Sequence, residues 1–393
     1  MGDSIRSDQL RAEDILHSLS RTTAAMSPVN ALKVLSIVFP LLQGVRAGLN
    51  LNSASNVAVY WGQNSYGQST GEYVQQRLSY YCQNSDIDVF QISFLTRING
   101  AGGVPEVNFA NAGNNCTTFP GTSLLNCPQI AEDIQDCQKA GKTILLSIGG
   151  ATYTEGGFSS EAAAISGAQL LWETFGPVSN SAASRPFGNA VIDGFDLDFE
   201  ATVNNMPAFA NQLRSLYAKD SSKSYYLTAA PQCPYPDAAN NAMLNGAVAF
   251  DAIWIQFYNN YCGLQSYVPG SSTQNNFNFA TWDNWAKSTS RNSKVKVFLG
   301  IPGNTGAAGS GYQSLDRVKE IIGYVKQFSS FGGVMIWDAS QVFANGGFLN
   351  GVKGALGGSV AEAAKSVSQS TRKTENEGFM TLARAEKPLG TGI

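Results

Sequence analysis

Eight short runs of apolar and β-branched residues recur along most of this chain, and segments with helical spacing separate them. One such segment places Leu315, Val318, Ile321, Ile322 and Val325 on one side of a helix. Regular alternation of strands and helices favours a parallel sheet, and eight repeats favour a closed (β/α)8 barrel over an open sheet. The predicted strands are Val57–Trp61, Val89–Phe94, Thr143–Ile148, Ile192–Phe199, Tyr226–Ala229, Ile253–Phe257, Val295–Gly300 and Val334–Trp337.

The fourth run carries an unusual alternation of acidic and apolar residues, Asp193-Gly194-Phe195-Asp196-Leu197-Asp198-Phe199-Glu200. Because a strand points successive side chains to opposite faces, Asp196, Asp198 and Glu200 line one face. Like charges in such proximity raise at least one pKa, which keeps a proton available for general acid catalysis. The pattern favours a catalytic strand over a solvated edge strand, since an edge strand rarely has a bulky apolar residue at each intervening position.

Composition narrows the chemistry further. The 393 residues include 43% hydrophobic and 14% charged residues, with a formal net charge of −3 and no Lys/Arg cluster that would indicate nucleic-acid binding. The only histidine, His17, lies in a segment that we expect to be removed. A mature domain without histidine has no Ser-His-Asp or Cys-His mechanism and lacks the commonest zinc ligand, so we expect no metal and no cofactor. Carboxylates, tyrosines and amides must carry the chemistry.

The two ends of the chain differ from its centre. Residues 1–47 are predicted to be an N-terminal extension with a secretory signal, because Lys33 precedes the apolar run Val34–Leu42 and small residues follow at Val45-Arg46-Ala47. That run is too short to span a bilayer. We therefore expect a secreted protein, extracellular or in the cell wall, with a single catalytic domain over residues 48–353 and an unstructured tail over 354–393. Whether translation starts at Met1 or Met26 stays open.

All six cysteines lie in the predicted mature part. An even number in a secreted chain suggests three disulfides, although six cysteines permit fifteen pairings and spacing alone does not choose among them.

Several further motifs, in this order, accompany the acidic run. With it, they resemble glycoside hydrolase family 18, and most closely its class III chitinases of plants and fungi. The resemblance covers roughly residues 55–338 and implies a TIM barrel with endochitinase activity on β-1,4 N-acetylglucosamine linkages. It also implies the disulfides Cys82–Cys137, Cys116–Cys127 and Cys233–Cys262. The motifs are Tyr60-Trp61-Gly62-Gln63-Asn64, Leu146-Ser147-Ile148-Gly149-Gly150, Ala230-Pro231-Gln232-Cys233-Pro234, Trp254-Ile255-Gln256-Phe257-Tyr258-Asn259-Asn260 and Gly333-Val334-Met335-Ile336-Trp337.

The resemblance also implies residue roles. Glu200 would protonate the glycosidic oxygen, while the substrate's own N-acetyl oxygen attacks the anomeric carbon with net retention. Asp198 would orient the acetamido group, Tyr258 would hydrogen-bond its oxygen, and Asp196 would tune Asp198. Trp337 would form an apolar floor under the sugar.

The predicted substrate-binding residues lie at strand ends, where TIM barrels place their active sites. Gly149 directly follows the third run and is either part of this site or a glycine that allows close backbone packing. The complete set of predicted substrate-binding residues is Tyr60, Gln63, Gly149, Gln256, Asn259 and Trp337.

Three alternatives remain at this stage. A lectin or inhibitor on the same barrel would lack the catalytic glutamate or obstruct the cleft. An endo-β-N-acetylglucosaminidase would act on glycoprotein glycans, and a two-carboxylate glycosidase would need a second acid at another strand end. We expect chitin or chitooligosaccharides as the partner of a monomer that binds neither nucleic acid nor membrane.

Overall fold

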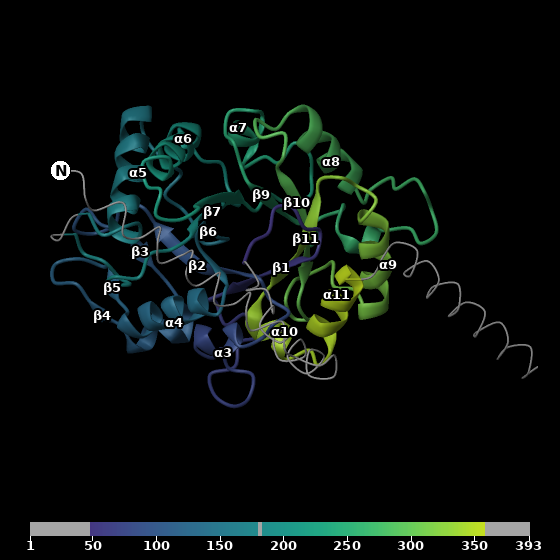
Figure 1. The fold of residues 1–393 in the computed structure, drawn as a ribbon, viewed down its shortest axis with the longest axis horizontal. Helices are drawn as coiled ribbons and strands as arrows, with labels where there is room; N and C mark the ends of the chain where they lie inside the picture. The colour runs from purple at the N-terminus through teal and green to yellow at the C-terminus, as the bar shows by residue number, and fades with distance from the viewer. Residues whose placement is uncertain (1–47, 180–182, 358–393) are drawn as a thin grey trace, which may run out of the picture. The chain divides into compact units, whose positions relative to one another are not determined.

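The computed structural model describes residues 48–179 and 183–357, which form a barrel of eight parallel strands with helices around it (Figure 1). β1 closes the barrel because it pairs in parallel with both β2 and β11. The predicted (β/α)8 barrel is confirmed. Its strands are β1 (Asn56–Trp61), β2 (Val89–Arg97), β6 (Thr143–Gly149), β7 (Gly194–Asp198), β8 (Tyr226–Ala229), β9 (Ala252–Gln256), β10 (Lys296–Pro302) and β11 (Phe331–Trp337).

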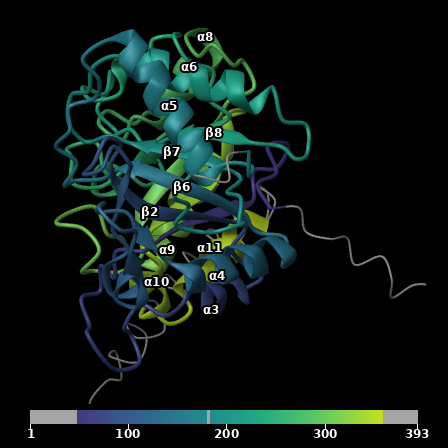
Figure 2. The ribbon, with the colours of Figure 1, turned by 90° about the vertical axis from the view of Figure 1, so that its left-hand side faces the viewer.

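Helices pack against the outer surface of the strands, as α5 and α6 do side by side in Figure 2. α9 illustrates why: Ser314 caps its first turn, and Val318, Ile321 and Val325 bury one side of the helix. The helices are α3 (Leu78–Cys82), α4 (Pro128–Lys139), α5 (Glu161–Phe175), α6 (Met206–Tyr217), α7 (Asn241–Leu244), α8 (Phe279–Ser288), α9 (Leu315–Val325), α10 (Ala339–Phe343) and α11 (Phe348–Gly357), with 3-10 turns at Ala110–Asn115 and Leu264–Ser266.

Alternate side chains of the strands build two separate apolar layers. On β7, Phe195 and Leu197 belong to the large core beneath the helices. A second, smaller cluster fills the inside of the barrel and includes Leu145, Trp254 and Phe298. Polar side chains that point inward from the same strands therefore meet one another inside the barrel.

The long segment after β2 is more structured than the sequence predicted. The Gly-, Asn- and Thr-rich composition of residues 99–126 predicts a loop, but these residues contain β3 (Glu106–Val107), antiparallel to β2, and the small pair β4 (Thr117–Thr118) and β5 (Leu125–Asn126). These strands are too short to leave an alternating sequence pattern. The Cys116–Cys127 disulfide closes the segment, as expected.

The other two predicted disulfides also form, which confirms the pairing that the family resemblance implied. Cys82–Cys137 links α3 to α4, and Cys233–Cys262 links the loops that follow β8 and β9. In the described part of the chain, no cysteine remains free.

Of the two predicted domain boundaries, only the C-terminal one, after residue 353, has described residues on both sides. α11 continues to Gly357, so the expected boundary after residue 353 falls within this helix. The predicted signal segment, residues 1–47, and residues 358–393 lie outside the described residues. Among the residues described, no helix has the length and apolarity needed to cross a membrane.

Candidate active site

Asp196 lies at the centre of a hydrogen-bond cluster inside the barrel. Its Oδ2 accepts hydrogen bonds from the hydroxyls of Tyr60 at 2.6 Å and Ser147 at 2.7 Å. Its Oδ1 accepts from the hydroxyl of Thr228 at 2.7 Å and the indole N–H of Trp254 at 2.9 Å. The carboxyl is fully buried, and burial raises its pKa while the four hydrogen bonds oppose that rise. Asp196 is therefore fixed in place as an acceptor.

Asp198 and Glu200 are linked by the side chain of Gln256. Its Nε2 donates a hydrogen bond to Asp198 Oδ1 at 2.9 Å and approaches Glu200 Oε1 at 3.5 Å. The same nitrogen donates to the carbonyl oxygen of Ala230 at 3.0 Å, which fixes the orientation of the amide. Asp198 is only 3% exposed, whereas Glu200, just beyond the end of β7, is exposed. Glu200 can meet a ligand from solvent, while Asp198 lies deeper in the barrel.

Burial and repulsion change the ionisation of these two acids. Burial, followed by the negative charges of Glu200, Asp196 and Asp237, raises the pKa of Asp198 well above its usual range. Although Glu200 is exposed as a residue, desolvation of its carboxyl group also raises its pKa, against the hydrogen bond from Gln256 and with a further contribution from Asp237. Two neighbouring acids of this kind favour a state in which one keeps its proton. A general acid needs that proton.

Tyr258 follows β9 on the same side of the barrel and is 6% exposed. Burial raises the pKa of its hydroxyl well above the usual value, and the charges of Asp198, Glu200 and Asp196 raise it further. The hydroxyl therefore stays protonated and remains a hydrogen-bond donor.

An aromatic group forms around Trp337, the last residue of β11, which is half-buried. Its ring lies 5.5 Å from that of Tyr60 and 5.9 Å from that of Phe94, measured between ring centroids, and stacks on the latter with an interplanar angle of 20°. Sequence reasoning named Trp337 and Tyr60 but missed Phe94, because it lies within an ordinary apolar run. The three rings form an apolar surface at the end of the barrel that carries Glu200.

Two predicted substrate-binding residues, Gln63 and Asn259, form hydrogen bonds with backbone groups of the protein. Nε2 of Gln63 donates to three carbonyl oxygens, those of Gly62, Ser93 and Asn108. Oδ1 of the exposed Asn259 accepts from the backbone N–H groups of residues 309 and 310 at 2.8 and 3.1 Å. These bonds hold the rim of the site, and direct contact of Gln63 or Asn259 with substrate stays a prediction.

Gly149 allows the backbones of two strands to approach closely. Its φ is +119°, and a Cβ atom there would lie 2.3 Å from the carbonyl oxygen of Asp198. The neighbouring Gly150 N–H donates to that same oxygen at 2.7 Å. The structure shows close packing at this glycine, directly beside Asp198, and a role of Gly149 in substrate binding stays a prediction.

Sequence reasoning missed several residues that complete the site. Thr228 lies on a short strand without a motif, and Asp237 and Asn240 lie in the loop that follows it. On β9, the alternation of side chains along the strand places Trp254 and Gln256 on the inward side. No such periodic signal marks residues of a loop, such as Asp237 and Asn240.

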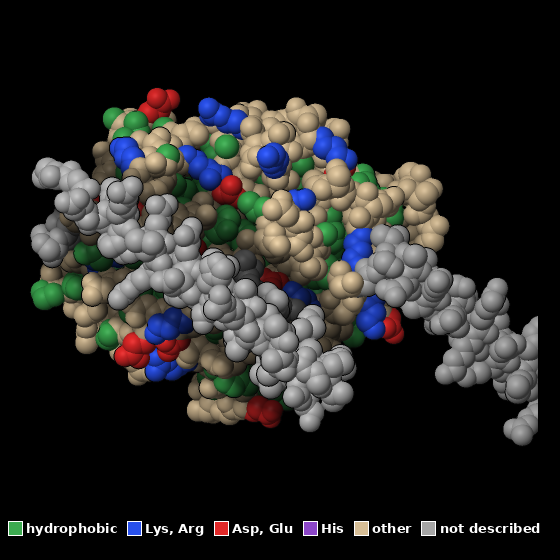
Figure 3. Space-filling model, in the orientation of Figure 1, with side chains coloured by type: hydrophobic (Ala, Val, Ile, Leu, Met, Phe, Trp, Pro, Cys, Tyr) green, Lys and Arg blue, Asp and Glu red, His purple; other side chains and the backbone are tan. Residues whose placement is uncertain are grey.

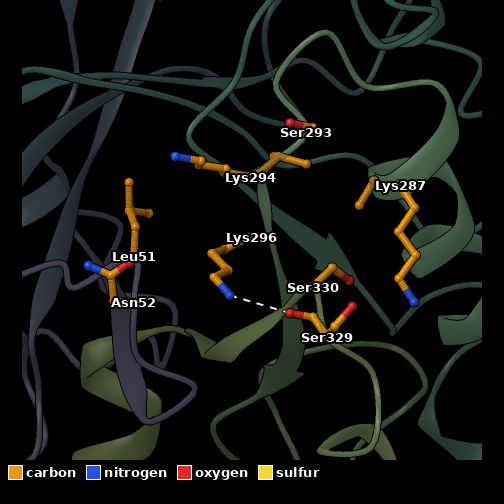
Figure 4. A pocket seen from close by; sticks show the side chains of 10 residues that line it. Leu51, Asn52, Lys287, Ser293, Lys294, Lys296, Ser329 and Ser330 are labelled. Atoms are coloured by element: carbon orange, nitrogen blue, oxygen red, sulfur yellow. Dashed lines mark hydrogen bonds between the residues drawn. The ribbon is translucent and has the colours of Figure 1, made fainter.

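A different hollow, of about 280 Å³, opens at the opposite end of the barrel, near the starts of β10 and β11 (Figure 4). Lys287, Lys294 and Lys296 line it, and Lys287 pairs with Asp283 at 2.5 Å. The hollow contains no carboxylate pair among its lining residues, so it does not offer the chemistry of the Glu200 site.

On the face of the molecule in Figure 3, acidic and basic side chains occur in small separate groups. Within the described ranges, no cluster of His, Cys, Asp or Glu is suited to hold a metal ion.

Known proteins share this sequence and barrel. The profile of glycosyl hydrolases family 18 matches residues 56–309. The chain is 55% identical to a class III chitinase of Arthroderma benhamiae over 333 residues, which cover 84% of this chain and 94% of the relative. It is 51% identical to endochitinase 33 of Trichoderma harzianum over 328 residues, covering 83% and 99% of the two chains.

Solved structures give the same result. The crystal structure of ICChI chitinase from Ipomoea carnea matches with a TM-score of 0.61 and 29% identity, over 76% of this chain and 99% of that one. A xylanase and α-amylase inhibitor protein, XAIP-II from Scadoxus multiflorus, matches with a TM-score of 0.60 and 31% identity, over 76% and 98%. The profile match, the close relatives and the shared barrel together establish that this chain belongs to glycosyl hydrolases family 18.

Proposed function

We propose that this protein is a secreted endochitinase that cleaves β-1,4 linkages between N-acetylglucosamine units with retention of configuration. The observation that carries the proposal is the hydrogen-bonded arrangement of Asp198, Gln256 and Glu200 at the carboxyl end of β7, in a chain closely related to chitinases.

Glu200 supplies the proton. It is exposed enough to reach a glycosidic oxygen, and its raised pKa keeps the proton in place until the bond begins to break. As the C–O bond of the linkage breaks, the proton passes from Glu200 to the departing sugar oxygen.

The nucleophile comes with the substrate. The carbonyl oxygen of the N-acetyl group bonds to the anomeric carbon as the leaving group departs, giving a positively charged oxazolinium ring. Asp198, buried beside this position, stabilises the charge and orients the amide, and the protonated hydroxyl of Tyr258 donates to its oxygen. Water then attacks the anomeric carbon as the bond from that carbon to the acetamido oxygen breaks, and the water gives a proton to Glu200, which restores the acid and yields the β-product.

Secretion is supported by the three disulfides, because such bonds persist in oxidising compartments. The predicted signal segment that would direct secretion lies outside the described residues.

The arrangement argues against the non-catalytic alternatives. A lectin or inhibitor has no need for two neighbouring acids with raised pKa, one of them buried, because desolvation of a carboxyl group costs stability. An endo-β-N-acetylglucosaminidase would use the same chemistry on glycoprotein glycans, and a two-carboxylate glycosidase would give no preference for N-acetylated sugars. Substrate choice separates these three enzymes.

The test is turnover of chitohexaose by wild type, Glu200→Gln and Glu173→Gln, with an N-glycosylated protein as the competing substrate. Glu173 is a half-buried residue of the outer helix α5, so its substitution is the matched control. We expect wild type and Glu173→Gln to cut chitohexaose internally and leave the glycoprotein intact. The turnover rate of Glu200→Gln should fall about 10²-fold to 10⁴-fold. Calorimetry should show that this variant still binds the oligosaccharide. Near-normal turnover by Glu200→Gln contradicts the assignment.

A further inference from the structure

A buried carboxyl outside the acidic motif lies in the loop between β8 and α7. Asp237 is 5% exposed, and its Oδ2 accepts a hydrogen bond of 3.1 Å from the Gln232 N–H. Its Oδ1 accepts from both the backbone N–H and the side-chain Nδ2 of Asn240, at 2.7 and 2.9 Å. In the described part of the chain, no Lys or Arg forms a salt bridge with it. A carboxyl buried without a cation is costly, and a simple turn does not require one.

Asn240 connects this carboxyl directly to the catalytic strand. The asparagine is fully buried, and its Nδ2 donates a second hydrogen bond, of 2.9 Å, to the carbonyl oxygen of Phe199. Phe199 stands between Asp198 and Glu200 in the sequence. The Asn240 Oδ1 has no partner among the described residues, so the amide is oriented to give both protons away. Asp237 thus orients the side-chain amide of Asn240, and this amide in turn binds the backbone carbonyl of the residue just before Glu200.

The same loop reaches the other side of the site. Gln232, which donates its N–H to Asp237, forms a β-bridge with Gln256 and accepts a hydrogen bond of 3.0 Å from Asn260 Nδ2. Gln256 in turn contacts Asp198 and Glu200. Asp237 therefore lies where the ends of β7 and β9 are joined.

Its negative charge also acts on the catalytic acids. It raises the pKa of Asp198 and of Glu200, in each case after the larger effect of burial. The titratable groups that face these acids are Asp196 from β7, Tyr60 from β1, Tyr258 after β9 and Asp237 from the loop after β8.

We propose that Asp237 is a positioning residue of this active site, which fixes the direction of Glu200 through Asn240 and Phe199 and acts on that acid through its charge. The proposal rests on the proposed function, in which Glu200 is the proton donor. It adds to that function a carboxyl that touches neither substrate nor reacting atoms.

The test replaces Asp237 with asparagine and measures the pH profile of kcat and KM on chitooligosaccharides, together with the titration of a ¹³C-labelled Glu200 carboxyl by NMR. We expect kcat to fall about 10-fold to 100-fold with KM nearly unchanged, because small misplacement of a reacting group is costly. Removal of the negative charge lowers the pKa of Glu200. Glu200 then loses its proton at lower pH, and the upper limb of the pH profile moves toward lower pH.

Asp251→Asn is the matched control. Asp251 is a carboxyl at the opposite end of the barrel that accepts from the Leu227 N–H at 2.9 Å and pairs with Arg214 at 2.8 Å. Its loss lowers stability without moving the pH limb or the Glu200 titration. If folded Asp237→Asn behaves in the same way, the inference is wrong.

A second variant, Asn240→Ala, keeps the carboxyl and removes its link to Phe199. We expect kcat to fall about tenfold with KM preserved, and an unchanged kcat overturns the positioning role even if Asp237→Asn does not fold. If the wild type fails to hydrolyse chitooligosaccharides, the proposed function is wrong. The NMR titration of Glu200 in wild type and Asp237→Asn still decides this inference.

Discussion

Gln256 donates a hydrogen bond of 2.9 Å to the buried carboxyl of Asp198. The amide that makes this bond also lies 3.5 Å from Glu200, so one side chain contacts both acids. Because the hydrogen bond favours the charged form of each carboxyl, it opposes the rise in pKa that burial causes.

Replacing Gln256 with methionine should therefore weaken catalysis without emptying the core. A hydrogen bond to a charged group contributes about 1.5–3 kcal/mol, which predicts a loss of kcat/KM of roughly 10-fold to 100-fold. Without the donor, the pKa values of Asp198 and Glu200 rise further, so both limbs of the pH profile should move to higher pH. The profile of kcat/KM on chitooligosaccharides measures this.

Gln138→Met is the control for that variant. Gln138 lies on the outer helix α4 and donates to Val191 O at 2.8 Å and Asp193 Oδ2 at 3.0 Å, so Gln138→Met also removes hydrogen bonds, but outside the barrel. A pH profile for Gln256→Met that matches the one for Gln138→Met would contradict the prediction.

Asparagine should have opposite effects on stability at two positions of β7. The pKa of Asp198 is raised in the folded state. Its protonation therefore stabilises the fold, fully so below the unfolded pKa of about 3.9, and this stabilisation is lost as the pH rises through the folded pKa. Asp198→Asn should raise the melting temperature at pH 7, with a smaller gain at pH 4. Its activity falls because the neutral amide no longer stabilises the cationic intermediate.

Asp196→Asn should instead lower the melting temperature at both pH values. Each carboxylate oxygen of Asp196 accepts two hydrogen bonds. The amide nitrogen that replaces one of these oxygens cannot accept, so two buried donors would lose their partner. Leaving buried donors unpaired costs about 1–3 kcal/mol each. Thermal unfolding of both variants at pH 7 and pH 4 checks the pair, and shifts of the same sign at pH 7 would refute the contrast.

Gly149→Ala should destabilise the protein by about 3 kcal/mol or more, because the backbone strain at positive φ adds to a clash with the carbonyl oxygen of Asp198. Gly346→Ala is the control, since a Cβ atom there meets nothing within 4 Å. Chemical denaturation measures both. Equal stability of the two variants would show that Asp198 and Gly149 can move apart.

The stereochemistry of the product tests the substrate-assisted step. If the N-acetyl group is the nucleophile, fresh product keeps the β-anomer, and fully deacetylated chitosan oligomers are not cleaved. NMR of the initial products reports the anomer directly. An α-product, or efficient cleavage of a deacetylated oligomer, would require a second carboxylate in place of the acetamido group.

The sequence determined the barrel and its acidic strand. Eight apolar runs separated by helical segments predict the fold because burial imposes a period on each element separately, and each period is visible within a few residues. The acids Asp196, Asp198 and Glu200 were assigned to one face by the same local rule. The disulfides, by contrast, followed only from the resemblance to a family, since spacing alone left fifteen pairings.

Tertiary structure alone decided which of these groups meet. Tyr60 and Trp254 are far from Asp196 in the sequence, yet both donate to its carboxyl because the barrel closes around it. Asn259 proved to brace a loop with its side-chain oxygen, and Asp237 proved to raise the pKa of Asp198 and Glu200, although no periodic pattern marks a loop residue. Local periodicity records which face a side chain takes, whereas hydrogen-bond partners and the electrostatic field depend on closure of the barrel.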